Sequence, residues 1–404
     1  MKISSDVVVI GRNYSTSLGI IRALGFAGYY VDVVRLTKGK QRFTPPEVKS
    51  KFVRNYFTTS ALVDEQCLIE ALINKVAEKN CKKIIIPADD LTVHILDSNA
   101  DCLSEYFIIP QLNGKNGDFK RYMDKGLQKE LAIKCGLPVA KSWIVEINNK
   151  GIYTIPEDIQ YPCYTKPNVS IGSPKTYIRK CDNDKELCTL LDEVAKKGVC
   201  AILIEEYLEV DKEYAVLGLS CDGKVLIVPG FIEAIKMGEG AHKGVTGVGR
   251  IIDASDRPKT IRMLKEYASQ FGLTGLFDID LIESKGVVYF AEINLRNGAS
   301  GYGITATGIN LPGKLIDYLL KNEWNDTIDK IKNNVIFASE KVLFENYEAG
   351  YCSWKQYKSY IKSADFSFIK CKEDMAPYRL FIMLTIIRRL QKFMKSVLGR
   401  WWKK

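Results

Sequence analysis

The pattern of apolar and polar positions opens with a strand, a helix and a second strand. Residues 6–10, an acid followed by four apolar residues, form a buried-strand run that ends at Gly11. Residues 17–25 have a helix-like pattern, and residues 30–34 form a second, largely apolar run. This βαβ opening predicts an α/β fold with an open sheet. Gly11 and Gly19 lie eight residues apart, and the unit lacks the G-x-G-x-x-G spacing of dinucleotide-binding oxidoreductases. The spacing argues against that class.

A later apolar run, residues 84–88, ends in two acids, Asp89 and Asp90. Ligands of open α/β sheets bind beyond the carboxyl ends of the strands. We therefore predict that Asp89, with Asp90 beside it, helps to position a substrate. Either acid could instead cap the following helix, because aspartate is a favoured N-cap residue.

The clearest candidate for chemistry is a pair of strand-like runs that flank residues 284–286, a sequence typical of a tight turn. Glu292, Asn294 and Arg296 alternate, so on a strand they face one side, and the hairpin brings Asp280 close to them. Two carboxylates and an amide oxygen suit Mg²⁺. The guanidinium of an arginine beside them can form two parallel hydrogen bonds to a carboxylate or phosphate. The alternative is the solvated face of a half-buried strand.

This hairpin resembles the metal-binding end of the ATP-grasp superfamily, which includes D-alanine–D-alanine ligase, biotin carboxylase, carbamoyl phosphate synthetase and D-aspartate ligase. The resemblance implies that Asp280, Glu292 and Asn294 bind Mg²⁺ or Mn²⁺. It also implies that Arg296 is catalytic and holds a substrate carboxylate. Other signatures of the family follow in the expected order upstream.

Two lysines match the phosphate-binding positions of the family. Lys125 follows Asp124 at the start of a helical stretch, and Lys166 closes a short strand at residues 161–167. The resemblance implies that both bind ATP phosphates and that Lys166 is also catalytic. Small residues at 168–173 would let backbone N–H groups close on phosphate oxygens. Without the resemblance, Asp124 and Lys125 read as an ordinary helix cap and the loop as a plain turn.

An apolar strand that runs into acids matches the adenine-binding hinge of the family. The resemblance implies that Glu205 and the backbones of Glu206 and Leu208 contact the adenine, and that Glu213 binds the ribose hydroxyls. Two acids at the end of a strand are also common on protein surfaces.

A glycine-rich segment at residues 231–250 occupies the position where family members close over substrate. Lys243 and Arg250 are candidates for binding an acidic group of the substrate, together with His242. The chain has only two histidines, so a metal or triad role for His242 is not expected.

Composition narrows the class of protein. The chain has 404 residues and 46% hydrophobic residues, which predicts two or three globular domains. Its eleven cysteines include no C-x-x-C motif, and the first residues run directly into a strand without a signal peptide. Free thiols of this kind predict a cytoplasmic protein.

The net charge of +10 is concentrated at one end of the chain. Residues 378–404 carry eight lysines and arginines and no acid, which leaves +2 for all the rest. We therefore expect no nucleic-acid surface. From Met383 the apolar residues recur at three- and four-residue spacing, and Trp401 and Trp402 follow. A basic amphipathic helix at 379–404 predicts an anchor on an anionic membrane surface. The alternative is a helix packed on its own domain or another subunit.

We expect an open-sheet N-terminal domain at 1–110, an ATP-grasp core of two α+β subdomains at 111–330, and a C-terminal extension at 331–404. The resemblance implies an ATP-dependent ligase that joins a carboxylate, such as an amino acid, to an amine through an acyl phosphate and releases ADP and phosphate. The basic helix suggests a lipid-linked acceptor, such as a cell-wall or polysaccharide precursor, at the inner face of the membrane. Two alternatives are a non-catalytic ATP-binding protein and a ligase of free amino acids or dipeptides.

Overall fold

The structure is a computed structural model that describes residues 2–39, 43–114, 118–169, 175–240, 243–321 and 330–401. Its first domain is a parallel five-stranded sheet in the order β3-β2-β1-β4-β5. The strands are β1 (Lys2–Gly11), β2 (Val31–Leu36), β3 (Val53–Thr59), β4 (Cys81–Pro87) and β5 (Phe107–Ile108). The predicted open α/β sheet is confirmed.

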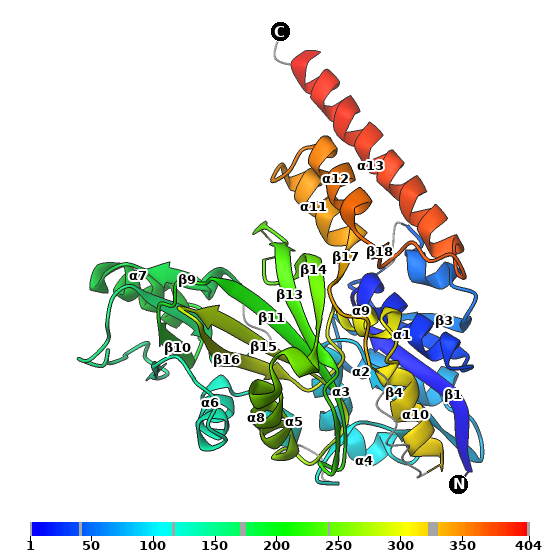
Figure 1. Cartoon of the computed structure of the whole chain (residues 1–404), viewed down its shortest axis with the longest axis horizontal. Helices are drawn as coiled ribbons and strands as arrows, with labels where there is room; N and C mark the ends of the chain where they lie inside the picture. The colour runs from blue at the N-terminus through cyan, green and yellow to red at the C-terminus, as the bar shows by residue number, and fades with distance from the viewer. Residues whose placement is uncertain are drawn as a thin grey trace.

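Helices cover both faces of this sheet (Figure 1). They are α1 (Tyr14–Phe26), α2 (Gln66–Ala71), α3 (Asp90–Ser98) and α4 (Ala100–Leu103), with a π-helical turn at Leu72–Val76 and a 3₁₀ turn, η1, at Pro46–Lys49. Alternate residues of β1 divide between the faces: Val7 and Val9 pack with α1, and Val8 and Ile10 pack with α2 and α3. A strand buried on both sides explains why residues 7–10 are all apolar.

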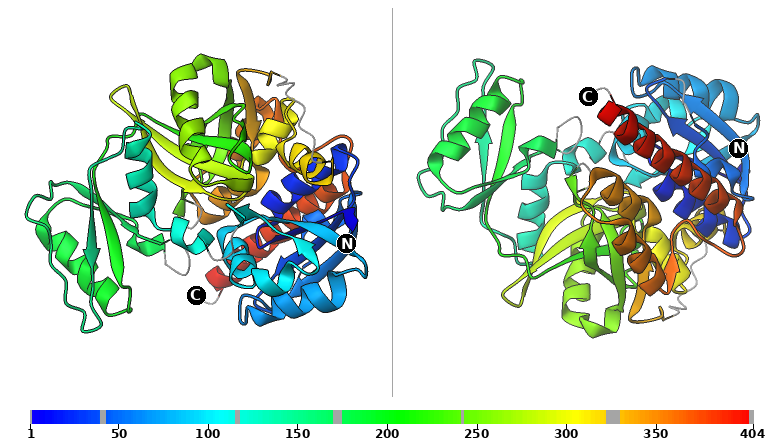
Figure 2. Two further views of the ribbon diagram at one scale, coloured as in Figure 1. Left: turned by 90° about the horizontal axis from the view of Figure 1, so that it is seen from below. Right: turned by 90° about the horizontal axis from the view of Figure 1, so that it is seen from above.

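The next part of the chain forms a small antiparallel sheet in the order β7-β10-β8-β9. Its elements and the helices before them are α5 (Asp118–Tyr122), α6 (Lys125–Lys134), β7 (Ser142–Glu146), β8 (Cys163–Pro167), 3₁₀ turn η3 (Lys175–Tyr177), β9 (Arg179–Cys181), α7 (Asp184–Ala195) and β10 (Ala201–Glu206). Figure 2 shows this small sheet as a separate lobe, with α6 on its inner side.

A larger sheet faces the small one, with a main path β16-β15-β11-β13-β14-β17-β18. It is built from β6 (Gln111–Leu112), β11 (Lys212–Cys221), β12 (Val225–Ile227), β13 (Gly230–Met237), β14 (Thr246–Asp253), β15 (Leu273–Ser284), β16 (Val287–Asn294), β17 (Val335–Ala338) and β18 (Phe366–Ser367). The helical elements associated with it are 3₁₀ turn η5 (Ala254–Asp256), α8 (Pro258–Ser269), α9 (Gly301–Ala306) and α10 (Leu311–Lys321). The sheet continues past residue 330, where the sequence places a domain boundary.

The last helices are α11 (Glu340–Ala349), α12 (Trp354–Ser363) and α13 (Ala376–Trp401). The predicted basic helix thus begins three residues earlier than expected. Its first half packs on α11, α12 and η1, and its end projects from the body (Figure 1).

A buried ion pair joins this C-terminal part to the first domain. Arg22 of α1 has no exposed surface and pairs with Asp374, with 3.0 Å between Nε and Oδ2. The guanidinium also donates to the backbone carbonyls of Phe368, Ile369 and Asp374. Ser50 donates a further hydrogen bond to Asp374. Buried charges are tolerated when they are paired and hydrogen-bonded, and the Arg22–Asp374 pair meets both conditions. We call this pair, with its hydrogen bonds, the Arg22–Asp374 clasp.

A second buried acid, Glu47 of η1, lies in the region covered by α13. Its Oε1 is 2.6 Å from Nη1 of Arg35. Burial nevertheless raises the pKa of Glu47 to about 7, against the opposing effect of Arg35.

We predict that Glu47 makes the protein less stable as the pH rises. Its folded-state pKa lies above the unfolded value, so the folded state binds the extra proton between about pH 4.5 and 7 and loses that advantage across this interval. Urea unfolding at several pH values should show a decline that Glu47→Gln reduces, by up to roughly 3 kcal/mol. Glu65→Gln, at an exposed site of the same domain, is the control. An unchanged pH profile in Glu47→Gln would contradict the assignment.

Candidate active site

The predicted hairpin exists as β15 and β16, joined by Lys285 and Gly286. Both turn residues have positive φ, at 50° and 77°, as a two-residue turn of type I′ requires. The register places Asp280 opposite Glu292 and Asp278 opposite Asn294. The expectation that Asp280 and the Glu292–Asn294 pair converge is confirmed in geometry. The metal role of these residues stays a prediction.

The acids of the hairpin affect one another's pKa. Removal from water, together with the charges of Asp278 and Glu292, raises the pKa of Asp280 well above its usual range. Burial also raises the pKa of Asp278 to about 6. Glu292 behaves oppositely: although desolvation opposes it, the nearby Lys125 lowers its pKa to about 2. Burial is the main cause of both rises, and the neighbouring carboxylates add to it.

Arg296 lies just beyond β16 and joins the hairpin to the first domain. Its Nε is 3.1 Å from Oδ1 of Asp90, and its Nη1 is 3.1 Å from Oδ2 of Asp278. Despite desolvation, Asp90 and Asp278 raise the pKa of Arg296 above its ordinary value. The sequence placed Arg296 correctly beside the acids but did not assign Asp278 a role.

The two acids predicted beyond β4 have different surroundings. Asp89 caps α3 by accepting a hydrogen bond from the Thr92 backbone, and it pairs with Arg12. Asp90 instead reaches Arg296. The capping alternative is thus confirmed for Asp89, whose substrate role stays a prediction, and Asp90 is the acid that lies at the site.

Helix α6 supplies two lysines, one turn apart, to the space between the two sheets. Nζ of Lys125 is 2.5 Å from Oε2 of Glu292 on β16, in the large sheet. Nζ of Lys129 is 2.5 Å from Oε1 of Glu205 on β10, in the small sheet. Gln128, between them, exchanges hydrogen bonds with the backbone of Ile293. Lys125 was predicted and Lys129 was missed, although the i, i+4 spacing places both on one face.

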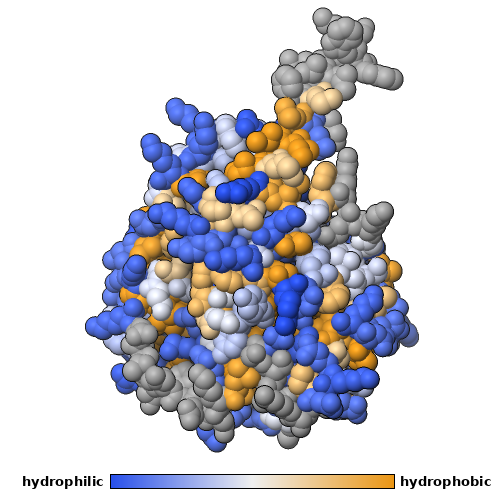
Figure 3. Space-filling model, turned by 90° about the vertical axis from the view of Figure 1, so that its right-hand side faces the viewer, coloured by the Kyte–Doolittle hydropathy of each residue, from blue (hydrophilic) through white to orange (hydrophobic). Residues whose placement is uncertain are grey.

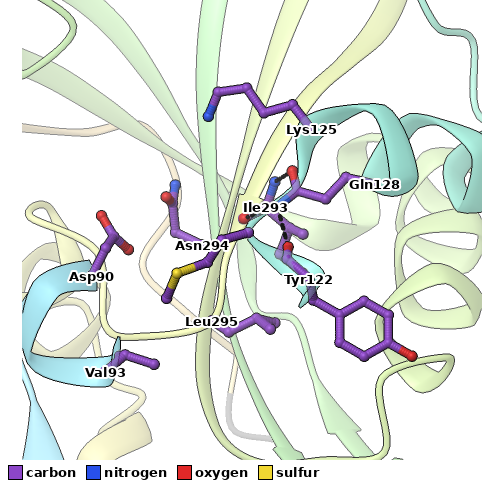
Figure 4. Close-up of a pocket in the computed structure, with 9 residues that line it drawn as sticks. Asp90, Val93, Tyr122, Lys125, Gln128, Ile293, Asn294 and Leu295 are labelled. Carbon is purple, nitrogen blue, oxygen red and sulfur yellow. Dashed lines mark hydrogen bonds between the residues drawn. The ribbon is translucent and has the colours of Figure 1, made fainter. Parts of the chain in front are cut away.

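Figure 4 shows how these groups meet at a small pocket between α3, α6 and β16. The side chains of Asp90, Asn294 and Lys125 point toward the same space, and Gln128 holds α6 to the backbone of β16. The pocket therefore lies where the first domain, the small lobe and the large sheet come together.

Lys166 and Glu205 lie on neighbouring strands of the small sheet. Nζ of Lys166 is 2.8 Å from Oε2 of Glu205, so the two oxygens of this carboxylate are divided between Lys166 and Lys129. Burial alone would raise the pKa of Glu205, but Lys166 and Lys129 lower it. The Glu205 side chain is therefore engaged by lysines, and its predicted adenine contact is not tested by these bonds.

The other residues that are predicted to bind the nucleotide lie on β10, just after it, and on β11. The backbone N–H of Glu206 donates to the carbonyl of Lys141, so only its carbonyl could make the expected adenine contact. Leu208 lies two residues after the end of β10. Glu213, on β11, is half-buried: desolvation raises its pKa, and Lys243 and Lys166 act against this rise. Glu213 thus lies within electrostatic range of both lysines.

The predicted substrate-binding segment is a hairpin of the large sheet. Arg250, on β14, lies opposite Glu233 on β13, and Lys243 is exposed beyond the strands. His242 and the greater part of the loop at 168–173 fall outside the described residues.

The hairpin fits a divalent metal ion by its chemistry. The oxygens of Asp280, Glu292 and Asn294 are hard donors, and a cation among them would favour the charged form of Asp280, whose pKa is raised by burial and by the charges of Asp278 and Glu292. Across the described ranges, no three side chains of the histidine, cysteine and acid types form a metal-binding group. A metal would therefore depend on the amide oxygen of Asn294 and on ligands from a substrate.

Comparison with known proteins agrees with this geometry. Residues 130–310 match the ATP-grasp domain family. The chain is 27% identical over 157 residues to the carbamoyl phosphate synthase large chain of Clostridium beijerinckii, a match that covers 36% of this chain and 14% of that protein. It is 21% identical over 232 residues to the formate-dependent phosphoribosylglycinamide formyltransferase of Wolinella succinogenes, covering 57% and 58% of the two chains. The chain thus spans about a seventh of the carbamoyl phosphate synthase large chain that it matches.

Solved structures share the fold at low identity. The L-amino acid ligase from Bacillus licheniformis has a TM-score of 0.61 at 15% identity, over 83% of this chain and 80% of that one. The N5-carboxyaminoimidazole synthetase from Staphylococcus aureus, complexed with ADP, has a TM-score of 0.61 at 15% identity, over 88% and 87%. At such identities the likeness shows the fold alone.

Proposed function

Since the chain contains a domain of the ATP-grasp family, we propose that it is an ATP-dependent ligase that joins a carboxylate to an amine. The observation that carries this proposal is the pairing of Asp280 with Glu292 on one hairpin, with Lys125 at the same carboxylate. Relatives by sequence or fold include an L-amino acid ligase and, in complex with MgADP, the biotin carboxylase domain of the Hydrogenobacter thermophilus 2-oxoglutarate carboxylase.

Different residues of the site would bind the metal ion, the phosphates and the adenosine during phosphoryl transfer. Asp280, Glu292 and Asn294 would hold Mg²⁺, which neutralises phosphate charge when bound. Lys125 and Lys166 would bind the ATP phosphates. The adenosine would lie toward Glu205, Glu206, Leu208 and Glu213.

Arg296, fixed by Asp90 and Asp278, would orient the substrate carboxylate and stabilise the oxyanion that develops on it. The carboxylate oxygen attacks the γ-phosphorus, and ADP leaves. The amine then attacks the acyl carbon of the acyl phosphate, phosphate leaves with its bonding electrons, and the nitrogen loses a proton to give the amide.

A screen of amino acids and amino sugars for ADP release tests the ligase directly. Release that requires both an acid and an amine, and trapping of the activated acid as a hydroxamate by hydroxylamine, are the expected results. ATP binding without turnover would favour the non-catalytic alternative. Turnover with free amino acids alone would favour a ligase of amino acids or dipeptides.

We predict that Glu292→Gln and Asn294→Ala each reduce Mg²⁺-dependent ADP release by roughly a hundredfold or more, because each removes an oxygen ligand of the proposed metal. Thermal unfolding should show a folded protein in both variants. Val287→Thr, at an exposed position of the same strand, should turn over normally. Near-normal turnover of either site variant at saturating Mg²⁺ would remove the metal assignment.

We predict separately that Lys166→Ala weakens ATP binding by roughly 10- to 150-fold, since it removes a charged contact to phosphate. Isothermal calorimetry would measure this. Lys185→Ala, on the exposed face of α7 in the same lobe, is the control. Equal affinity of Lys166→Ala and the unmodified protein would count against the phosphate role.

We further propose that the acceptor is lipid-linked, a finer assignment supported by the surface of α13. Its inner face, with Phe381 and Thr385, is buried. Its outer face exposes an apolar stripe, and Figure 3 shows apolar surface gathered on this helix. The stripe consists of Met383 (50% exposed), Ile386 (50%), Leu390 (57%) and Met394 (58%).

The charge of this helix favours an anionic lipid surface over a second copy of the chain. Eight basic residues and no acid lie between residues 378 and 404, so two such helices would repel one another. Part of this charge is used internally: Arg389 stacks 3.9 Å from the ring of Trp354, and Arg388 pairs with Glu348. No helix in the described ranges is long and apolar enough to cross a bilayer. The chemistry fits a helix that lies on a membrane, which would place the enzyme at its inner face.

We predict that the protein sediments with vesicles containing phosphatidylserine and not with phosphatidylcholine vesicles. The double variant Ile386→Asp, Leu390→Asp should not bind the vesicles. Both positions are exposed, and each substitution replaces an apolar side chain of the stripe with a negative charge. Val63→Asp, at a 73% exposed position of the first domain, is the control. High salt should weaken but not abolish binding. Absence of binding, or a change of oligomeric state in the double variant, would overturn the proposal.

A further inference from the structure

Lys129 is a lysine inside the protein, at the back of the proposed nucleotide site. Its side chain is 3% exposed, and the Glu205 carboxylate that it contacts is 7% exposed. The other oxygen of Glu205 contacts Lys166, which is 15% exposed and therefore nearer to solvent. The three groups therefore form a row, with Lys129 innermost, Glu205 in the middle and Lys166 outermost.

The charges along this row do not cancel. Within the row, two ammonium groups and one carboxylate leave a net charge of +1; Glu292 also acts on Lys166, but it is itself paired with Lys125. If Lys129 were neutral, Glu205 and Lys166 would form a closed ion pair with no net charge to offer an anion. Burial lowers the pKa of Lys129, and the Glu205 carboxylate at 2.5 Å acts against this fall.

We propose that Lys129 is a positioning residue that neutralises Glu205 from the protein side, so that Lys166 presents an uncompensated positive charge to a triphosphate. This inference rests on the proposed function, because it assumes that Lys166 faces ATP phosphates. Lys129 need not touch the nucleotide, since Glu205 and Lys166 lie in front of it.

Calorimetry with two probes separates this role from general damage to the site. Lys129→Met should weaken binding of magnesium tripolyphosphate and of ATP by roughly tenfold or more, since one unit charge is lost beside the anion. Binding of adenosine, which carries no phosphate, should change little. Lys129→Arg should retain affinity for tripolyphosphate. Lys134→Met, which removes an exposed lysine from the end of the same helix, is the matched control.

A double variant gives the decisive measurement. Lys129→Met combined with Glu205→Gln removes one charge of each sign and returns the row to +1, so tripolyphosphate affinity should recover relative to Lys129→Met alone. A purely structural role for Lys129 predicts no recovery, because the bond between α6 and β10 is lost in both. If Lys129→Met alone does not fold, as judged by thermal unfolding, the double variant and Glu205→Gln are compared with the unmodified protein instead. Each of these two variants is then expected to bind tripolyphosphate at least as tightly as the unmodified protein does. Weaker tripolyphosphate binding in both variants overturns the proposal.

Two further outcomes distinguish failure of this inference from failure of the proposed function. Unmodified protein that binds tripolyphosphate while Lys129→Met binds it equally overturns this inference and leaves the proposed function intact. Unmodified protein that binds neither ATP nor tripolyphosphate overturns both.

Discussion

Two lysines on one short helix connect the two sheets of this protein. Lys125 pairs with Glu292 of the large sheet and Lys129 with Glu205 of the small one, and Gln128 fixes the helix between them. Breaking one partner of a buried ion pair costs about 3–5 kcal/mol, because the other charge is left without compensation in a poorly solvated place. The mutual position of the sheets and the electrostatics of the site therefore depend on the same few bonds. A ligand that competes for these lysines acts directly on the joint between the lobes.

The first domain is tied to the rest of the protein in two places. One is an ion pair at the candidate active site: Asp90, at the carboxyl end of the parallel sheet, contacts Arg296 at the end of the hairpin. The other is structural: α9 and α10 pack with α1 on one face of the first sheet, and Arg22 clasps Asp374. The carboxyl end of β4, the edge at which open α/β sheets bind their ligands, is thus joined to the acidic hairpin.

Local sequence rules were sufficient for the hairpin. Alternation placed Glu292 and Asn294 on one face, and Lys285-Gly286 could take up the positive φ that the turn demands. The order of lysines and acids along the chain was then similar to that of the ATP-grasp family, and this resemblance implied the core. The features of the hairpin depend on neighbours a few residues apart, which a single sequence displays.

Contacts between distant segments could not be predicted in the same way. Lys129 reads as an ordinary surface lysine of a helix until β10 is known to lie against it. Asp278 and Asp90 acquire a role only through Arg296, which is 206 residues from Asp90. The amphipathic pattern of α13 identified an apolar face, but it could not say that Phe381 is covered by the chain itself while Leu390 is not. Periodicity defines faces, and only the tertiary fold decides which of them are covered.

The Arg22–Asp374 clasp has a consequence for the order of folding on the ribosome. Arg22 is synthesised long before its partners, which lie between residues 368 and 374. Until that segment emerges, the arginine must stay hydrated, and the face of the first sheet that α9 and α10 later cover remains open. The N-terminal domain can therefore collapse early but cannot complete its interior until residues 368–374 have been translated. Contacts of such long sequence separation are associated with slow final folding and with prolonged exposure of apolar surface.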